Sequence, residues 1–235
     1  MIWSALPSTP MSSAARMKIG SAQLVSQSSL RPGLSDLNFE GGRSATIFLP
    51  PNCRDAVGMP LLCMLHGAAG VYPDTLPVLF ELAKRESLIV IAPLSLRRTW
   101  DVLYGSYGED VRFIEGLIDL MVRQHGVNSS RLALAGFSDG ASYALTVGLK
   151  NGDVFSDIIA FSPGFFLPDS PVGKPQVFIS HGSADRMLPV TSARGIADRL
   201  KGDGYHLKFE EFEGGHEVPG AIIEEAVRRV LRRKV

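Results

Sequence analysis

The sequence lacks the features that mark several specialised classes of protein. Its 24 basic and 24 acidic residues balance, so no charge excess points to nucleic acid or to an anionic membrane surface. No apolar run approaches the roughly 20 residues that a membrane span needs, and residues 1–20 do not have the pattern of a secretory signal. We therefore expect a cytoplasmic protein with no nucleic-acid partner and no membrane span.

Cysteine is scarce. Cys53 lies in a loop-like stretch and Cys63 lies inside an apolar run, and neither belongs to a CxxC or Cys/His spacing. This pattern predicts two reduced thiols and no zinc site.

The chain of 235 residues suits one α/β domain, and its apolar fraction of 45% is ordinary for a protein with a hydrophobic core. The Ser, Pro and Ala content of residues 1–20 predicts a loose arm, followed by a single domain over residues 21–235. No apolar stripe clearly exceeds what a core needs, so the sequence leaves the oligomeric state open, a homodimer included.

Eight short runs have the length and β-branched content of strands. They are residues 22–27, 45–49, 61–65, 88–92, 132–135, 158–161, 177–180 and 207–212. The middle runs are continuously apolar, as in strands that a parallel sheet buries on both faces. The last run alternates, which predicts a half-exposed strand near an edge.

Helical patterns alternate with these runs from residue 61 onward, which predicts a doubly wound, mostly parallel α/β sheet of about eight strands with helices on both faces. The patterns cover residues 77–85, 110–125, 143–149, 191–200 and 221–231. No helical pattern separates the first two strands, so we expect them to form an antiparallel edge hairpin. About fifteen residues join the sixth and seventh strands, too few for a large cap domain.

The chemistry is predicted at the ends of the strands. Residues 136–140 read Gly-Phe-Ser-Asp-Gly between a buried strand and a helix, the context that a nucleophile elbow requires. The pattern alone occurs by chance in roughly one chain in five of this composition, so Ser138 could also be an ordinary turn serine. The amide of Asp139, at the helix N-terminus, is a candidate oxyanion donor. His66-Gly-Ala68-Ala-Gly follows an earlier strand, and the amide of Ala68 is the second candidate, although a plain strand-to-helix turn explains this loop equally well.

Two later loops complete the pattern. Asp185 follows the strand at 177–180, and His216 lies in a glycine-rich loop after the last strand. The chain order serine, acid, histidine is the order of α/β-hydrolases. Other residues of these types fit less well. Only His216 among the five histidines lies on a loop after the last strand, which sets aside His66, His125, His181 and His206. The acids Asp157, Asp169 and Asp203 do not follow a core strand at the right place.

From about Thr46 to its end, the chain resembles the α/β-hydrolase superfamily and, more narrowly, the phospholipase/carboxylesterase family, which includes acyl-protein thioesterases. The resemblance rests on LLCMLHGAAG, GFSDGAS, IIAFSPG, VFISHGSADRMLPV and FEGGHEVP. It implies an α/β-hydrolase fold and a serine hydrolase without cofactor or metal. Family patterns usually have glycine where Ala69 stands, and the thioesterases usually have glutamine where Asp139 stands.

The resulting prediction is a hydrolase that cleaves small-molecule carboxylic esters of small to medium acyl chains through an acyl-enzyme on Ser138. A thioesterase, a feruloyl or polyester esterase, a peptidase, and a non-catalytic ligand receptor on the same fold are the alternatives. The predicted pocket residues lie on loops at the active edge of the sheet, where packing onto the core is an equally good explanation for each. They are Tyr72, Trp100, Tyr104, Phe165, Phe166, Met187 and Leu188.

Overall fold

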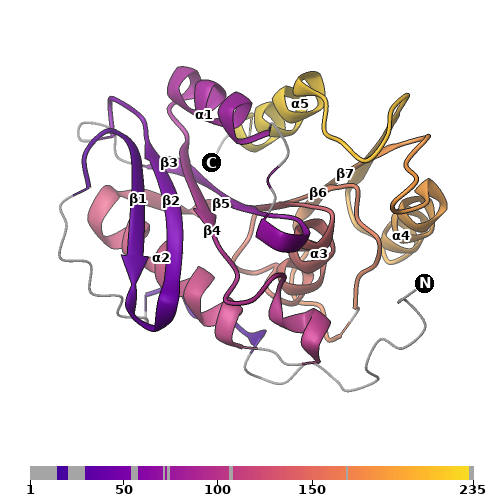
Figure 1. The fold of residues 1–235 in the computed structure, drawn as a ribbon, viewed down its shortest axis with the longest axis horizontal. Helices are drawn as coiled ribbons and strands as arrows, with labels where there is room; N and C mark the ends of the chain where they lie inside the picture. Colours follow the sequence, from indigo (N-terminus) through magenta and orange to yellow (C-terminus); the bar gives the residue numbers. More distant parts are fainter. Residues whose placement is uncertain are drawn as a thin grey trace.

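The structure is a computed structural model that describes residues 15–20, 30–53, 58–70, 72, 75–105, 108–167 and 169–232. Its centre is an eight-stranded sheet in the order β1-β2-β4-β3-β5-β6-β7-β8 (Figure 1). Strand β2 runs antiparallel to both of its neighbours, β1 and β4, and the six strands from β4 to β8 in this order run parallel to one another. The strands are β1 (Gly33–Phe39), β2 (Arg43–Leu49), β3 (Met59–Leu65), β4 (Ile89–Pro93), β5 (Val127–Phe137), β6 (Asp157–Phe161), β7 (Gln176–Gly182) and β8 (Leu207–Phe212).

Helices cover both faces of this sheet. Figure 1 shows α1 and α5 together on one side, with α2 and α3 on the opposite side. The helices are α1 (Thr75–Glu86), α2 (Glu109–His125), α3 (Asp139–Lys150), α4 (Val190–Gly202) and α5 (Gly220–Leu231). The sheet is therefore the middle layer of three, and the predicted fold class is confirmed.

The core explains why the central strands are apolar along their whole length. All seven residues of β3 and all five residues of β4 and of β6 are buried. Side chains of these strands that point one way pack against α1 and α5, and those that point the other way pack against α2, α3 or α4. A strand with helices on both faces has no solvent-facing side, so its sequence does not alternate.

The edges differ from the centre. In β8 no residue is fully buried, and it is the last strand of the sheet, as its alternating sequence predicts. At the other edge the predicted antiparallel hairpin exists, but its first strand is β1, which the sequence pattern missed, and it joins β2 through the short turn Glu40–Gly42. The strand predicted at residues 22–27 lies outside the described residues.

The prediction of a loose arm is wrong for residues 15–20. Ala15 and Met17 are buried in the core beside α2 and α3. The side chain of Asn151 accepts a hydrogen bond from the Met17 amide at 2.7 Å and donates one to the Ala15 carbonyl at 2.8 Å. Two buried apolar side chains and the hydrogen bonds with Asn151 thus hold residues 15–20 against the core. The Ser- and Ala-rich composition did not indicate this packing. Residues 1–14 lie outside the described residues.

The connection between β6 and β7 contains no helix among its described residues, so no large cap covers the carboxyl ends of the strands. None of the helices in the described ranges is long and apolar enough to cross a membrane.

Candidate active site

Ser138 stands in the sharp turn between β5 and α3. Its backbone has φ 55° and ψ −117°, a region that residues with a side chain rarely adopt. The turn is held on both sides, because the Ser138 amide donates to the Phe161 carbonyl at 2.9 Å and its carbonyl accepts from the Ser142 amide at 3.0 Å. Such an over-determined, strained turn is how a nucleophile elbow presents its hydroxyl.

The two glycines of the motif are required by close backbone contacts. A Cβ atom on Gly136 would lie 2.2 Å from the carbonyl oxygen of Gly140. A Cβ on Gly140 would lie 2.4 Å from the carbonyl oxygen of His66 and 2.5 Å from that of Leu65. No side chain fits at either position unless the backbone moves, which explains the spacing of glycines around Ser138.

The structure brings the three predicted residues together. His216 Nε2 lies 2.9 Å from Ser138 Oγ, and His216 Nδ1 lies 2.6 Å from Asp185 Oδ2. An ionised carboxylate only accepts hydrogen bonds, so Nδ1 carries the proton, and Nε2 is free to accept from the Ser138 hydroxyl. The imidazole also packs against the ring of Phe137, with centroids 4.7 Å apart.

Asp185 is held in its charged form. Its Oδ1 accepts the amides of Met187 and Leu188 at 2.8 and 2.9 Å, while Oδ2 faces His216. Burial raises the pKa of this carboxyl, but the hydrogen bonds from Leu188, His216 and Met187 outweigh burial, and the net pKa lies below its usual value. A carboxylate of this kind can orient the imidazole and stabilise its protonated form.

Two other histidines lie near the site but cannot act as its base. Burial lowers the pKa of His66, whose Nε2 accepts the Ser95 amide at 2.9 Å. His181 is fully buried; its Nε2 donates to the Leu188 carbonyl at 2.9 Å and lies 3.3 Å from Asp185 Oδ2. Both rings therefore support neighbouring groups.

The two predicted oxyanion donors lie on different elements. Asp139 is the first residue of α3, where helix amides have no partner within the helix. Ala68 begins the short turn Ala68–Gly70 after β3. The next amide, that of Ala69, donates to the Arg98 carbonyl at 2.6 Å, so it is already engaged. Ala69 has φ 60°, a left-handed conformation that explains the glycine usual at this position in the family.

Trp100 and Tyr72, both predicted to line the pocket, instead support the turn at His66. Trp100 has no exposed surface. Its ring stacks between His66 and Tyr143, at centroid distances of 4.6 and 5.1 Å, and its Nε1 donates to the His66 carbonyl at 2.9 Å. The Tyr72 hydroxyl lies 2.9 Å from the Pro93 carbonyl and 3.2 Å from that of Met64. Their polar atoms are thus engaged with backbone, and Trp100 cannot contact a substrate in this arrangement.

Three other predicted pocket residues are mainly packed. Phe165 and Leu188 are buried, each with 8% of its surface exposed. Phe166 is partly buried on the α4 side, where the guanidinium of Arg199 lies 5.3 Å from its ring centroid. These side chains therefore pack mainly inside the protein, where they support the loops that follow β6 and β7.

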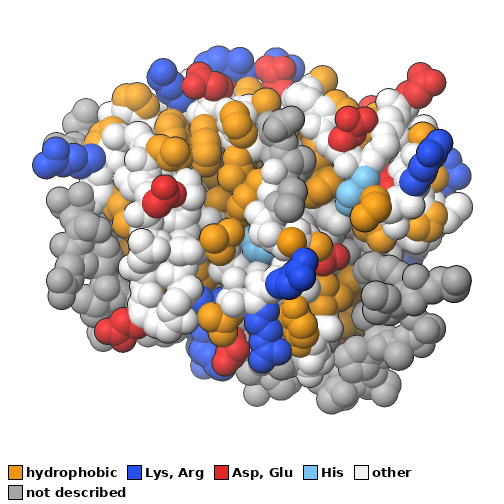
Figure 2. All heavy atoms as spheres, in the orientation of Figure 1, with side chains coloured by type: hydrophobic (Ala, Val, Ile, Leu, Met, Phe, Trp, Pro, Cys, Tyr) orange, Lys and Arg blue, Asp and Glu red, His pale blue; other side chains and the backbone are white. Residues whose placement is uncertain are grey.

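The remaining predicted pocket residues, Tyr104 and Met187, are exposed. Met187 has 73% of its surface exposed and lies two residues after Asp185; Tyr104 has 45%. Leu94 and Leu96, which the sequence did not single out, are also exposed on the loop after β4. All four follow the carboxyl ends of strands, and Figure 2 shows hydrophobic side chains spread across the middle of this face with charged ones around them.

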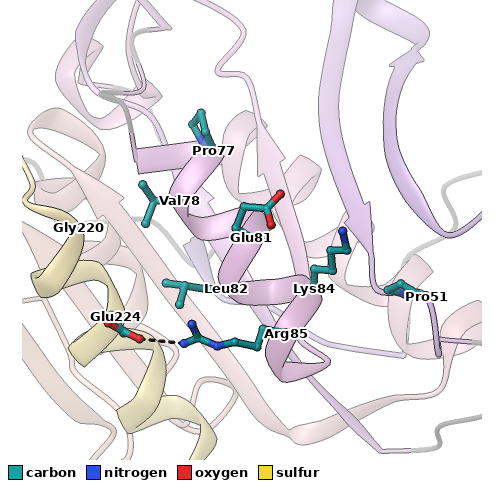
Figure 3. Close-up of a pocket in the computed structure, with 9 residues that line it drawn as sticks. All are labelled: Pro51, Pro77, Val78, Glu81, Leu82, Lys84, Arg85, Gly220 and Glu224. Atoms are coloured by element: carbon teal, nitrogen blue, oxygen red, sulfur yellow. Dashed lines mark hydrogen bonds and ion pairs between the residues drawn. The ribbon is translucent and has the colours of Figure 1, made fainter.

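A separate groove lies beside α1 and α5, and Figure 3 shows its lining. Arg85 and Glu224 form an ion pair there at 2.8 Å. The groove contains none of the three predicted catalytic residues and no serine, cysteine or histidine. It is lined by Pro51, Pro77, Val78, Glu81, Leu82, Lys84, Arg85, Gly220 and Glu224. The described residues also include no cluster of three or more His, Cys, Asp or Glu side chains that could hold a metal.

The fold and the serine-histidine-aspartate geometry define the class of the α/β-hydrolases. The sequence profile of the phospholipase/carboxylesterase family matches residues 108–230. This chain therefore belongs to that family of esterase- and thioesterase-type serine hydrolases, as its motifs predicted.

Curated relatives match parts of the chain. Acyl-protein thioesterase 1 of Neurospora crassa is 32% identical over 110 residues, which are 43% of this chain and 44% of that protein. The bifunctional acetylxylan esterase/xylanase XynS20E of Neocallimastix patriciarum is 26% identical over 177 residues, 74% of this chain and 23% of that protein. The chain thus spans less than half the length of either relative.

Solved structures match the fold more fully. The crystal structure of esterase PE8 superposes with a TM-score of 0.62 at 23% identity, covering 84% of this chain and 99% of that chain. At this level of identity the similarity concerns the fold.

Sequence reasoning missed the contacts that support the site. Thr99 Oγ1 donates to Asp139 Oδ2 at 2.8 Å, across 40 residues of chain. Phe137 packs under His216. A single hydrogen bond between distant segments leaves no periodic pattern in the sequence, so the motifs did not indicate the first contact.

Proposed function

We propose that this protein is a serine hydrolase that cleaves carboxylic esters of small to medium acyl chains through an acyl-enzyme on Ser138. The observation that carries the proposal is the continuous hydrogen-bonded series from Ser138 Oγ to His216 at 2.9 Å and from His216 to Asp185 at 2.6 Å. A serine hydroxyl is a weak nucleophile at neutral pH, and an adjacent oriented base is what activates it.

The reaction proceeds in two halves. Ser138 Oγ attacks the ester carbonyl carbon as its proton passes to His216 Nε2, and the amides of Ala68 and Asp139 stabilise the negative oxygen. The alcohol leaves with the proton from His216, and an acyl-serine remains. Water then attacks the acyl group, gives its proton to His216, and the carboxylic acid is released as Ser138 regains its proton.

The preference for small and medium acyl groups is supported by exposed apolar residues on loops that follow the carboxyl ends of the strands. Exposed apolar side chains follow the ends of two strands: Leu94, Leu96 and Tyr104 come after β4, and Met187 comes after β7. They offer an apolar but open surface, and the residues that the structure describes form no cap domain that would enclose a long acyl chain.

The test is hydrolysis of p-nitrophenyl acetate and butyrate together with labelling by a fluorophosphonate probe. The wild type is expected to hydrolyse both esters and to be labelled, and Ser138→Ala is expected to lose at least about 1000-fold in kcat and all labelling. Ser130→Ala, a change at an exposed serine near the start of β5, is the matched control and should behave like the wild type. Wild-type protein that shows neither activity nor labelling would exclude the proposal.

A thioesterase is the second candidate, because the acyl-protein thioesterase of Neurospora crassa is among the relatives. The aspartate after Ser138, where the thioesterases usually have glutamine, favours the carboxylesterase. Comparing kcat/KM for a butyryl ester and a butyryl thioester decides between them. A preference of more than about tenfold, or 1.4 kcal/mol in transition-state binding, for the thioester would make the thioesterase the better assignment.

A further inference from the structure

Residues 94–100, between β4 and the short helix Asp101–Tyr104, form a loop that contacts the residues flanking Ala68 in the turn after β3 and the side chain of Asp139. We call it the bracing loop. On one side the Arg98 carbonyl accepts the Ala69 amide at 2.6 Å, and the Ser95 amide donates to His66 Nε2 at 2.9 Å. On the other side Thr99 Oγ1 donates to Asp139 Oδ2 at 2.8 Å. One short loop thus touches the turn after β3 and the start of α3.

The bracing loop is itself fixed from behind by a buried polar network. Asp110 is 2% exposed and accepts the amides of Leu96 at 3.2 Å and Asp101 at 2.9 Å. Arg43 pairs with the same carboxylate. Tyr143 donates to Asp101 Oδ1 at 2.9 Å, which ties the end of the loop to α3. The loop therefore has a defined position from which it can hold other groups.

The distance between the two donors matters because the oxyanion of the reacting ester must accept hydrogen bonds from both amides. Ala68 belongs to the turn and Asp139 to the helix, and a misplacement of about 1 Å in a catalytic group can cost about 100-fold in rate. Gly140 lies directly against the His66 carbonyl and sets one contact between turn and helix. The Thr99–Asp139 bond joins α3 to the bracing loop, which in turn holds the turn after β3 through the Ala69 amide and the His66 ring.

The same bond controls where a negative charge lies. Asp139 is next to the predicted nucleophile, and a carboxylate that turned toward the reacting carbonyl would oppose the negative charge that develops there. The Thr99 hydroxyl holds one carboxylate oxygen on the side of the bracing loop. At the first turn of α3 the carboxylate remains favourable to the helix dipole.

We propose that Thr99 and Asp139 are a pair of positioning residues, whose hydrogen bond sets the spacing of the oxyanion donors and keeps the Asp139 carboxylate away from the reacting oxygen. This inference rests on the proposed function. In this proposal the side chain of Asp139 has a role in addition to that of its amide. This role gives a reason for aspartate at a position where the thioesterases usually have glutamine.

The experiment measures kcat and KM for p-nitrophenyl butyrate in four variants. Thr99→Val removes the hydroxyl at nearly constant volume, and Asp139→Ala removes its acceptor; each is expected to lower kcat about tenfold and to change KM less than twofold. Thr99→Ser keeps the donor and Asp139→Asn keeps an acceptor, so kcat of both variants should stay within about threefold of the wild-type value. The double variant Thr99→Val/Asp139→Ala should be no slower than the slower single variant, because both remove one interaction.

A matched control is available on β2, where Thr46 donates to Asp36 at 2.6 Å far along the chain from these residues. Thr46→Val removes a Thr–Asp bond of the same kind and should leave kcat and KM unchanged. Circular dichroism checks folding, and if Thr99→Val does not fold, Asp139→Ala against Asp139→Asn decides the question.

The outcomes separate the two proposals. An active wild type with Thr99→Val or Asp139→Ala at wild-type kcat would overturn the positioning role alone. Equal losses in Thr99→Val and Thr99→Ser, or a change confined to KM, would also overturn it, because the hydroxyl would then not act through the donors. A wild type that hydrolyses no ester would overturn the proposed function and this inference with it.

Discussion

His216 Nδ1 lies 2.6 Å from Asp185 Oδ2, while the other oxygen of that carboxylate accepts two backbone amides. The position of the Asp185 side chain is therefore fixed by backbone amides of its own loop, in addition to its hydrogen bond with His216. The direction of the imidazole follows from the folding of residues 185–188, and its tautomer follows from the charge of the acid.

Replacing Asp185 by asparagine should disable the base. The asparagine amide can donate a hydrogen bond to Nδ1, which would favour the tautomer with the proton on Nε2, and a protonated Nε2 cannot accept from the Ser138 hydroxyl. We expect kcat for p-nitrophenyl butyrate to fall by about 1000-fold or more. Asp153→Asn, at an exposed ion pair with Arg16, is the matched control and should keep wild-type activity. A loss smaller than tenfold in Asp185→Asn would contradict the assigned role.

The same carboxylate should make stability depend on pH. Its pKa is below the usual value because hydrogen bonds from Leu188, His216 and Met187 outweigh burial, the largest opposing cause. A lowered pKa means that the folded state holds this proton more weakly than the unfolded state. The stabilisation is therefore present above the unfolded value, about 3.9, and is lost as pH falls through the folded value.

Urea unfolding from pH 7 to pH 3 measures this effect. The difference in free energy of unfolding between wild type and Asp185→Asn is expected to be largest near neutral pH and to shrink as pH falls below about 4. Ser138→Ala keeps the carboxylate and should follow the wild-type curve. A difference that grows on acidification would show that the sign is wrong.

Gly140 should tolerate no side chain. In Gly140→Ala the new methyl group would meet the carbonyl oxygens of His66 and Leu65 at 2.4 and 2.5 Å, and backbone cannot move aside cheaply. We expect a loss of about 2 kcal/mol or more in the free energy of unfolding. Gly195→Ala, in the middle of α4 with no atom within 4 Å of the new Cβ, should instead stabilise by about 0.5–1 kcal/mol. Thermal unfolding of both variants measures the contrast, and equal effects would refute it.

The thiol of Cys63 should be inert in the folded protein. Cys63 has no exposed surface on β3, and burial raises its pKa far above that of a free thiol. In the variant Cys53→Ser, Ellman's reagent is expected to leave Cys63 unmodified over a period in which the urea-unfolded variant reacts completely. Rapid modification without urea would mean that β3 opens far more readily than its burial implies.

Local sequence was sufficient for the central elements. The runs at β3, β4 and β6 are apolar without alternation because both of their faces are buried. Their sequences alone therefore indicate that a layer of helices covers each face of the sheet. It also identified Ser138, Asp185 and His216, because each follows a strand, and parallel strands bring their carboxyl ends to one edge.

Local sequence failed where a partner decides the structure. The β1 strand alternates between intermediate and exposed residues and is a strand because β2 pairs with all of it. The docking of Met17 depends on Asn151, more than 130 residues away. In both cases a partner outside the segment decides the structure, so the segment's own residues carry little signal.

What the sequence alone determined is therefore the layered α/β fold, the family and the identities of the three candidate catalytic residues. Only the tertiary structure decided how they are supported. It buried Trp100 behind His66 and turned Asp139 toward Thr99. The physical reason is the distance along the chain over which each signal acts. Burial on two faces requires an apolar side chain at every position of a strand, so the local sequence shows it. A hydrogen bond between loops forms only when the folded chain brings its two partners within about 3 Å.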